Sequence, residues 1–268
     1  MKKIQEYFQG HKDTYFVAEI GNNHQGSVEM GKKLIDEAVK SGADIAKFQM
    51  RCLEKLYQKN STFDLGTEYT LELLNKYELP KSDLFSLFDY AKEKGITPIC
   101  TPFDLESFDY LEAYGMEAYK IASADLTNFV LIDKVIESGK HFIMSTGMSD
   151  EAEIELITSY IRKKTDNFSL LHCNSTYPAP FSEINLSYMQ RLADFEPRVF
   201  GYSGHERGYE IAIAAVAMGA RIIEKHFTLD KNLEGNDHRV SLLPNEFKAM
   251  VQAIRNVELG IGNMKRRT

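Results

Sequence analysis

Cysteine and long hydrophobic runs are both scarce in this chain of 268 residues. Three cysteines are too few for a disulfide framework in a chain of this size, which favours a reducing, cytoplasmic setting. No run of about 18 apolar residues occurs, so the sequence predicts no membrane span. No apolar stretch follows the basic residues near the N-terminus, so it also predicts no signal peptide. We therefore expect neither a secreted disulfide scaffold nor an integral membrane protein.

Positive charge is in short supply as well. The formal net charge is -7 with His neutral, and a chain that is acidic overall is a poor partner for nucleic acid, whose phosphates must be neutralised. An anionic ligand would have to be held by a few local Lys and Arg side chains. Hydrophobic residues make up 43% and charged residues 26%, which is ordinary for a globular domain and excludes a disordered chain, a fibre or a coiled coil.

Short β-branched runs alternate with longer segments of helical periodicity along the chain. The short runs predict eight strands: Tyr15–Ile20, Asp44–Gln49, Thr97–Thr101, Ala118–Ala122, His141–Ser145, Phe168–Cys173, Arg198–Tyr202 and Arg221–His226. The longer segments predict helices over Val28–Lys40, Leu84–Lys94, Leu105–Tyr114, Phe129–Ser138, Glu151–Lys163, Tyr209–Met218 and Asn245–Leu259. The one long irregular segment, Met50–Thr67, is of a length that is more often functional or flexible than neutral.

This alternation predicts an α/β fold, because strands separated by helices of this length form parallel βαβ units. Eight units in a chain of domain size favour a single-domain (β/α)8 TIM barrel over residues 14–264, with residues 1–13 as an N-terminal cap segment. A doubly wound sheet is the alternative. It agrees less well because Asn23 stands where a dinucleotide-binding turn requires Gly.

Polar side chains gather where the predicted strands end, which is where barrel enzymes carry their chemistry. The positions are Glu19, Lys47, Gln49, Thr101, Lys120, Ser123, Ser145, Thr146, His172, Cys173, Ser203, His205, Glu224 and His226. Packing alone does not account for ionisable residues at almost every strand end in otherwise apolar runs. We therefore expect a polar site at this end of the barrel.

Two lysines, Lys47 and Lys120, are candidates for an anion clamp, since Lys is a compact point charge suited to phosphate. Each taken alone is also consistent with a surface lysine whose stem lies along apolar residues. A lysine inside a barrel can instead form a Schiff base with a carbonyl substrate. The residues by themselves leave these alternatives open.

Two histidines, His205 and His226, end the seventh and eighth predicted strands, which are neighbours in a barrel. Two imidazoles with open positions beside them suit Mn, Fe, Co or Zn, although each His alone is more often structural. Asp237 is either a nearby carboxylate or a turn residue. His172 and Cys173 point to opposite faces of their strand, so only one faces the interior, and a buried inert thiol is the favoured interpretation of Cys173.

Eight strings of the sequence, in the same order along the chain, resemble the sialic acid synthase (NeuB-type) family. They are AEIGNNHQGS (18–27), KFQ (47–49), TPFD (101–104), YKIAS (119–123), STGMS (145–149), LLHCNSTYPAP (170–180), GYSGH (201–205) and EKHFTLD (224–230). The resemblance runs from about residue 13 to residue 260. It is specific for the family and much less specific for the sugar.

The resemblance implies a phosphoenolpyruvate-dependent transferase that forms a C–C bond. Such an enzyme condenses phosphoenolpyruvate with an open-chain (N-acyl)hexosamine-type sugar aldehyde and yields a nonulosonic acid and phosphate, for surface polysaccharide or glycoconjugate biosynthesis. It also implies a divalent cation held by His205 and His226, usually Mn²⁺, with Mg²⁺ or Co²⁺ as alternatives. The cation would act as a Lewis acid on the aldehyde.

The same resemblance implies a role for each site residue. The phosphoenolpyruvate side would use Lys47, Thr101, Lys120, Ser123, Ser145 and Ser203. The sugar side would use Glu19, Asp125, Asn174, Tyr177 and Asp237. Among these, we expect the catalytic roles to fall to Glu19, Lys47, Lys120 and Asp237.

Departures from the family pattern fall on the sugar side. Asp125 stands where the family has Glu, and Asn174-Ser175 replaces the usual Thr-Asn order. The family usually adds a C-terminal antifreeze-like domain that takes part in a swapped dimer. This sequence is expected to lack that domain, which leaves a homodimer as an open prediction. Two other interpretations remain: a class I Schiff-base aldolase, and a catalytically silent sugar-binding subunit of polysaccharide assembly.

Overall fold

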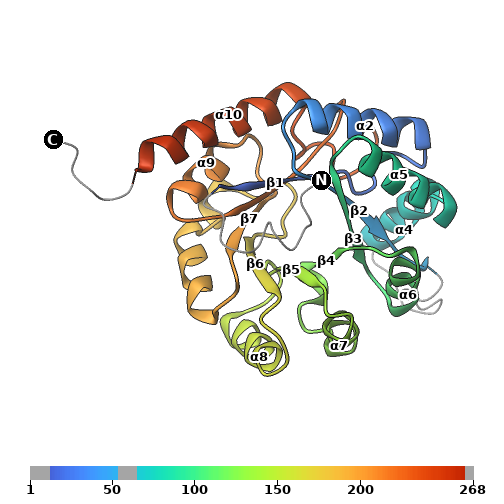
Figure 1. Ribbon diagram of the computed structural model, residues 1–268. Helices are drawn as coiled ribbons and strands as arrows, with labels where there is room; N and C mark the ends of the chain where they lie inside the picture. Colours follow the sequence, from blue (N-terminus) through green and yellow to red (C-terminus); the bar gives the residue numbers. More distant parts are fainter. Residues whose placement is uncertain (1–12, 54–64, 263–268) are drawn as a thin grey trace.

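The computed structural model describes residues 13–53 and 65–262. Within them, eight parallel strands close into a barrel in sequential order, and β8 pairs back onto β1 (Figure 1). The strands are β1 (Tyr15–Glu19), β2 (Ile45–Met50), β3 (Thr97–Pro102), β4 (Ala118–Ile121), β5 (His141–Ser145), β6 (Phe168–Cys173), β7 (Phe200–Gly204) and β8 (Ile222–His226). The predicted (β/α)8 barrel is confirmed. The predicted cap segment, residues 1–13, lies outside the described residues except for Asp13.

Helices surround the barrel. They are α2 (Val28–Lys40), α4 (Leu65–Tyr77), α5 (Lys81–Glu93), α6 (Leu105–Tyr114), α7 (Phe129–Glu137), α8 (Glu151–Arg162), α9 (Glu210–Ala217) and α10 (Pro244–Ile261), with short 3₁₀ segments η1 (Ser123–Asp125) and η2 (Phe181–Glu183) and the longer η3 (Leu186–Phe195). No helix among the described residues is long and apolar enough to cross a membrane.

Capping side chains explain why several helices begin where they do. Ser27 accepts a hydrogen bond from the Met30 amide at the start of α2, and Asp150 forms a capping box with Glu153 at the start of α8. Each satisfies an amide that the first helical turn leaves without a partner. Such local signals are the reason that the predicted starts of these two helices agree with the structure, whereas α5, which has no side-chain cap, begins three residues before the predicted Leu84.

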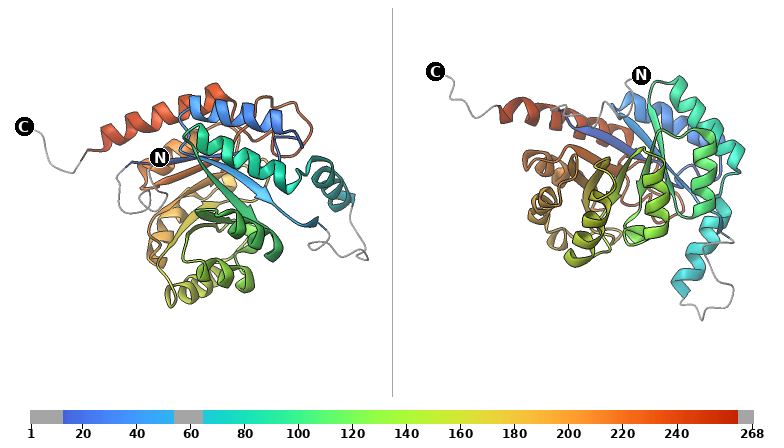
Figure 2. Two further views of the ribbon diagram at one scale, coloured as in Figure 1. Left: turned by 45° about the vertical axis from the view of Figure 1, so that its right-hand side comes forward. Right: turned by 60° about the horizontal axis from the view of Figure 1, so that its bottom comes forward.

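The helix α4 and the 3₁₀ segments η1, η2 and η3 were not predicted. The helix α4 begins at Leu65, inside the segment that was expected to be irregular, and continues beyond that segment to Tyr77. It lies outside the ring of helices, beyond α5 (Figure 2). The connection between β6 and β7 is the 3₁₀ helix η3 rather than an α-helix. Of the segment Met50–Thr67, residues 54–64 lie outside the described residues.

Side chains along each strand alternate between the barrel interior and the helices, as a period of two requires. The interior holds one apolar layer, formed by Val17, Ile45, Ile99, Ala118, Ile143, Leu171 and Ile222. Outward residues such as Phe16 and Phe48 join the larger core beneath the helices. The strand register then stacks the next inward residues above the apolar layer. It pairs Glu19 with Lys47 and with His226.

Close helix packing requires one glycine. Gly31 lies in the middle of α2, where a Cβ atom would lie 2.5 Å from the Leu87 side chain of α5. A larger residue would push these two helices apart. The β1–α2 and β2–α5 units are therefore held tightly together beside the site.

Candidate active site

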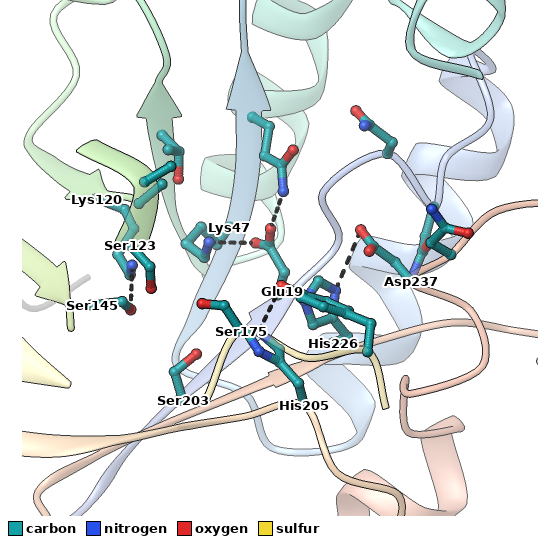
Figure 3. A pocket seen from close by; sticks show the side chains of 18 of the residues that line it. Glu19, Lys47, Lys120, Ser123, Ser145, Ser175, Ser203, His205, His226 and Asp237 are labelled. Atoms are coloured by element: carbon teal, nitrogen blue, oxygen red, sulfur yellow. Dashed lines mark hydrogen bonds and ion pairs between the residues drawn. The ribbon is translucent and has the colours of Figure 1, made fainter. Parts of the chain in front are cut away.

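A cavity of about 540 Å³ opens at the carboxyl ends of the strands, directly above the apolar layer. Every strand contributes at least one side chain to its wall, so the site is a product of barrel closure (Figure 3). Polar lining residues from the strands are Glu19, Lys47, Gln49, Thr101, Lys120, Ser145, Ser203, Glu224 and His226. The polar site expected at this end of the barrel is present.

All of the predicted site residues except Asn174 line this cavity. They are Glu19, Lys47, Thr101, Lys120, Ser123, Asp125, Ser145, Tyr177, Ser203, His205, His226 and Asp237. The structure does not bring Asn174 into it. The Asn174 side chain donates to the Glu183 carbonyl at 3.0 Å and accepts from the Thr176 amide at 2.9 Å. It therefore holds the turn after β6, and Ser175 lines the cavity in its place.

Lys47 lies between two buried carboxylates. Its Nζ is 3.0 Å from Glu19 Oε2 and 3.5 Å from Glu224 Oε1. Burial alone would lower the pKa of Lys47, but the two carboxylates outweigh it and raise that pKa. Ser203 donates to Glu224 Oε1 at 3.1 Å, while Glu224 Oε2 has no hydrogen-bond partner. Lys47 is therefore already balanced by two negative charges.

Lys120 on β4 contacts no carboxylate among the residues that the structure describes. Its Nζ donates to Ser145 Oγ at 2.6 Å and to the Ile121 carbonyl at 2.9 Å. Burial lowers the pKa of Lys120 to about 8. Ser123 approaches from η1, where its hydroxyl accepts from the Gly147 amide at 3.2 Å. An ammonium and two hydroxyls thus face one part of the cavity, which suits an anion.

The two predicted metal ligands face one another across the other part of the cavity. The rings of His205 and His226 lie 5.3 Å apart between centroids. His205 Nδ1 lies 2.6 Å from the Asn174 carbonyl, which only accepts, so Nδ1 carries the proton and Nε2 the lone pair. That lone pair accepts from the Tyr177 hydroxyl at 2.8 Å. Within residues 13–53 and 65–262, His226 Nδ1 has no hydrogen-bond partner, and it lies 3.6 Å from Asp237 Oδ2.

This arrangement fits a divalent cation in its donor chemistry. Burial, followed by the neighbouring imidazole of His226, lowers the pKa of His205 to about 3, which keeps its ring neutral and able to coordinate. Among the residues that the structure describes, no group of three His, Cys, Asp or Glu side chains is arranged to hold a metal. A site with two His ligands would leave its remaining positions to water and substrate.

Of the neighbouring pair on β6, Cys173 is the residue that faces the cavity. His172 points outward, and its Nε2 donates to the Ile184 carbonyl at 2.7 Å. Cys173 Sγ lies 3.5 Å from His205 Nδ1. Burial raises the pKa of the Cys173 thiol to about 11, so it stays protonated and unreactive at neutral pH.

Several residues of the site lie in connections between elements, where sequence reasoning assigned no role. Arg51 follows β2 directly, donates to the Gln49 side chain and stacks over the Phe103 ring at 4.3 Å from its centroid. Gln49 in turn donates to Glu19 Oε1 at 2.7 Å. The position of Arg51 immediately after a strand was the available signal. Glu234 belongs to the connection between β8 and α10, and no local pattern marked it.

The model of the NeuB family matches residues 34–266 of the sequence. The chain belongs to the NeuB family. A relative in Campylobacter jejuni, an N,N'-diacetyllegionaminic acid synthase, is 42% identical over 94% of this chain and 78% of its own length. An N-acetylneuraminate-9-phosphate synthase from Drosophila melanogaster is 38% identical over 92% of this chain and 68% of its own length.

Solved structures agree with this membership. The NeuB-family barrel described above superposes with a TM-score of 0.88 on an N-acetylneuraminic acid (sialic acid) synthetase from Leptospira borgpetersenii in complex with citrate. That protein is 34% identical, and the match covers 96% of this chain and 87% of the other. A truncated 3-deoxy-D-arabino-heptulosonate 7-phosphate synthase from Thermotoga maritima, 16% identical with a TM-score of 0.70, shares the fold.

Proposed function

We propose that this NeuB-family protein is a nonulosonic acid synthase, which condenses phosphoenolpyruvate with an open-chain sugar aldehyde and releases phosphate. The observation that carries the proposal is the meeting of Lys120 with the His205–His226 pair in one cavity built by all strands. An anion subsite and a cation subsite lie side by side there. Relatives that are 42% and 38% identical bear the names of legionaminic and sialic acid synthases, which supports the same reaction class.

The reaction balances as follows. The C2=C3 π pair of phosphoenolpyruvate forms the bond from C3 to the aldehyde carbon, and the carbonyl electron pair moves to the aldehyde oxygen, which takes a proton. Water then bonds to the electron-deficient C2 and loses one proton. Phosphate leaves with the electrons of its bond to C2 as the new hydroxyl loses the second proton, and the product is a 2-keto acid. The protein must therefore bind two anionic groups, hold a water molecule and move protons.

Lys120 and the hydroxyls around it are suited to binding phosphoenolpyruvate. The Lys120 ammonium and the hydroxyls of Ser123, Ser145 and Ser203 face the same volume as Thr101. Charge-assisted hydrogen bonds of this kind are stronger inside a dry site than in water. Part of this work falls to Lys47, whose charge also fixes Glu19 and Glu224.

Glu19 is the best-placed group for moving a proton or orienting water. Its two oxygens are held by Gln49 at 2.7 Å and by Lys47 at 3.0 Å, so its position in the cavity is defined. A carboxylate within hydrogen-bond reach of a reacting oxygen is a common general base. On the sugar side, Asp125, Tyr177 and Asp237 line the cavity and offer hydrogen bonds to hydroxyl or acylamino groups.

His205 and His226 would hold the divalent cation, with Mn²⁺ as the expected ion and Mg²⁺ or Co²⁺ as alternatives. When bound, the cation supplies a Lewis acid that polarises a carbonyl oxygen. The Tyr177 hydroxyl, which donates to His205 Nε2 at 2.8 Å, would have to turn away to free that nitrogen. Exhaustive chelation should abolish activity, and Mn²⁺ should restore it. Full activity of a protein shown to be metal-free would refute this assignment.

The decisive experiment measures phosphate release from phosphoenolpyruvate with a panel of sugars: N-acetylmannosamine, mannosamine, mannose and 2,4-diacylamino sugars. We expect release to require an acceptor sugar and to vanish in Lys120→Met. The expected acceptor class is an N-acylhexosamine. No release with any member of the panel would contradict the proposal and favour a catalytically silent sugar-binding subunit.

One observation favours a second candidate, a class I Schiff-base aldolase. A buried amine whose pKa burial lowers to about 8, as at Lys120, is partly unprotonated near neutral pH and is a competent nucleophile. Borohydride reduction in the presence of pyruvate would then trap a covalent adduct on Lys120. We expect no adduct in the wild-type protein. Labelling of the wild type that is absent from Lys120→Arg would establish the aldolase instead.

A further inference from the structure

A second charged cluster lies immediately behind the histidine pair, on the outer face of the barrel. Lys225 on β8 and Glu206, just after β7, are both wholly buried, and their charged atoms Nζ and Oε1 lie 2.9 Å apart. Lys225 stands between Glu224 and His226, which both line the cavity. Because side chains alternate along a strand, Lys225 points away from the cavity. This pair therefore does not contact a ligand there.

Each hydrogen-bonding atom of the Glu206 carboxylate has a partner. Lys225 donates to Glu206 Oε1 and, at 2.8 Å, to the Glu206 backbone carbonyl, while the Tyr202 hydroxyl donates to Oε2 at 2.7 Å. Gly204 leaves the space that this carboxylate occupies. A Cβ atom at Gly204 would lie 2.6 Å from Glu206 Oε2 and 2.7 Å from the Tyr202 ring. We call Tyr202, Gly204, Glu206 and Lys225 the β7–β8 clamp. Their contacts are compatible with one position of the Glu206 carboxylate.

Stability alone is a poor explanation for the clamp. A buried ion pair seldom stabilises a fold more than apolar residues of the same volume would, although losing one partner is strongly destabilising. Such a pair does hold the two elements that carry it in one relative position. The Lys225 ammonium donates to both the carboxylate and the backbone carbonyl of Glu206, so its position depends on that one residue.

The clamp is adjacent in sequence to both candidate metal ligands. Glu206 directly follows His205, and Lys225 directly precedes His226. His205 and His226 line the cavity whereas Glu206 and Lys225 do not. A rotation of the backbone at Glu206 or Lys225 would therefore turn the adjacent imidazole in the cavity. A clamp across β7 and β8 therefore sets the separation and the direction of the two rings.

We propose that Glu206 and Lys225 are positioning residues that orient His205 and His226 for the reaction through the backbone of β7 and β8. This inference rests on the proposed function only where it is tested by the binding of Mn²⁺. The ring orientation is a property of the protein itself.

The test uses the double variant Glu206→Gln/Lys225→Met, which removes both charges together and avoids leaving one buried charge alone. Cooperative unfolding in urea shows whether it folds. Calorimetric titration with Mn²⁺ alone measures the affinity of the His pair. We expect a folded protein whose Mn²⁺ affinity falls about 10- to 100-fold, the range typical of groups that orient metal ligands. The matched control is Asp109→Asn/Lys134→Met, which removes an exposed ion pair and should leave the affinity unchanged.

Side-chain ¹⁵N spectra of the histidines supply a readout independent of metal. The wild-type His205 ring should show protonated Nδ1 and unprotonated Nε2, as its bond to the Asn174 carbonyl requires. In the double variant we expect that single pattern to be replaced by averaged tautomers. Wild-type spectra together with wild-type Mn²⁺ affinity in a folded double variant would overturn the positioning role.

The two proposals fail in distinguishable ways. If the wild-type protein binds no Mn²⁺, the proposed cation site fails, and the ¹⁵N spectra alone decide the role of the clamp. If Mn²⁺ binds and phosphate is released normally in the folded double variant, the clamp proposal fails while the proposed function stands. Should the double variant not fold, Glu206→Asp keeps the charge and shortens its reach, and the same two readouts apply to it.

Discussion

At the scale of single residues, Lys120 makes the pH dependence of phosphoenolpyruvate binding predictable. Burial lowers its pKa to about 8, so the ammonium is present below that pH and lost above it. Affinity should therefore be constant at lower pH and fall about tenfold per pH unit above 8, because each unit removes nine-tenths of the remaining charge. The dissociation constant measured from pH 6.5 to 9.5 checks this.

The variant Lys120→Arg is the control, because a guanidinium keeps its charge over that whole range. Its affinity should be lower than that of the wild type at pH 7 and independent of pH. A wild-type affinity that stays level up to pH 9.5 would mean that the ammonium does not contact the phosphate or carboxylate.

Lys47 is expected to matter for folding as much as for binding. Its removal leaves Glu19 and Glu224 buried without a cation, and breaking such a pair costs about 3–5 kcal/mol. Lys47→Met should lower the free energy of unfolding by that amount, whereas Lys120→Met should not, since Lys120 contacts hydroxyl and carbonyl oxygens. Urea unfolding of both variants measures the difference.

The triple variant Glu19→Gln/Lys47→Met/Glu224→Gln removes all three charges and should recover most of the lost stability. Equal destabilisation by the Lys47 and Lys120 variants would show that the carboxylates are not balanced by Lys47. The role of Lys47 in binding an anion stays a prediction, to which the structure adds its contacts with Glu19 and Glu224.

At the scale of elements, the connection from β8 to α10 forms one wall of the site and is tied to α4 by Glu234. Lys76 and Tyr77 donate to Glu234 Oε2 at 2.5 Å and 2.6 Å, and Gln25 donates to the Glu234 carbonyl at 3.0 Å. The same connection carries Asp237 toward the cavity. Glu234→Ala should therefore raise KM for the sugar several-fold, since the wall is less ordered before substrate binds.

KM for phosphoenolpyruvate should change less than twofold in that variant, because Lys120 lies on β4, across the barrel from β8. Steady-state kinetics with each substrate varied in turn measures both values. The control Glu29→Ala breaks an exposed ion pair with Lys33 within α2 and should alter neither KM. A change of equal size in both KM values would indicate general loosening of the barrel.

At the scale of the whole molecule, ligand binding and barrel closure are coupled, because every strand contributes to the cavity. A ligand that binds only the folded barrel, present at a hundred times its Kd, adds about 2.7 kcal/mol to the free energy of unfolding. Phosphoenolpyruvate at that concentration should raise Tm by about 5–10 °C. Lys120→Met at the same concentration should show a much smaller rise. A wild-type Tm that does not respond would place the ligand elsewhere.

The architecture was predictable from the sequence because its signals are local. Val28–Lys40, His141–Ser145 and Phe168–Cys173 have the predicted bounds, since periodicity and capping residues act within a few positions of the chain. The helix α4 was not predicted, and only its first three residues lie within the stretch expected to be irregular. The 3₁₀ helix η3 was not predicted either, although its buried residues Met189, Leu192 and Phe195 recur every three positions. Its conformation depends on packing against β6 and β7, which a local pattern does not show.

The sequence by itself determined that the polar residues at the strand ends meet, because strand ends converge wherever parallel strands close into a barrel. It did not determine the contributions of the connections, where Asn174 stays outside the cavity and Arg51 and Glu234 line it. Only the tertiary structure decided what each of them does there. Lys47 is balanced by carboxylates from β1 and β8, the His205 tautomer is set by a carbonyl after β6, and Lys225 is paired across to Glu206. Electrostatic interactions and hydrogen bonds act over a few ångströms in space, and residues far apart along the chain come that close only when the barrel has closed.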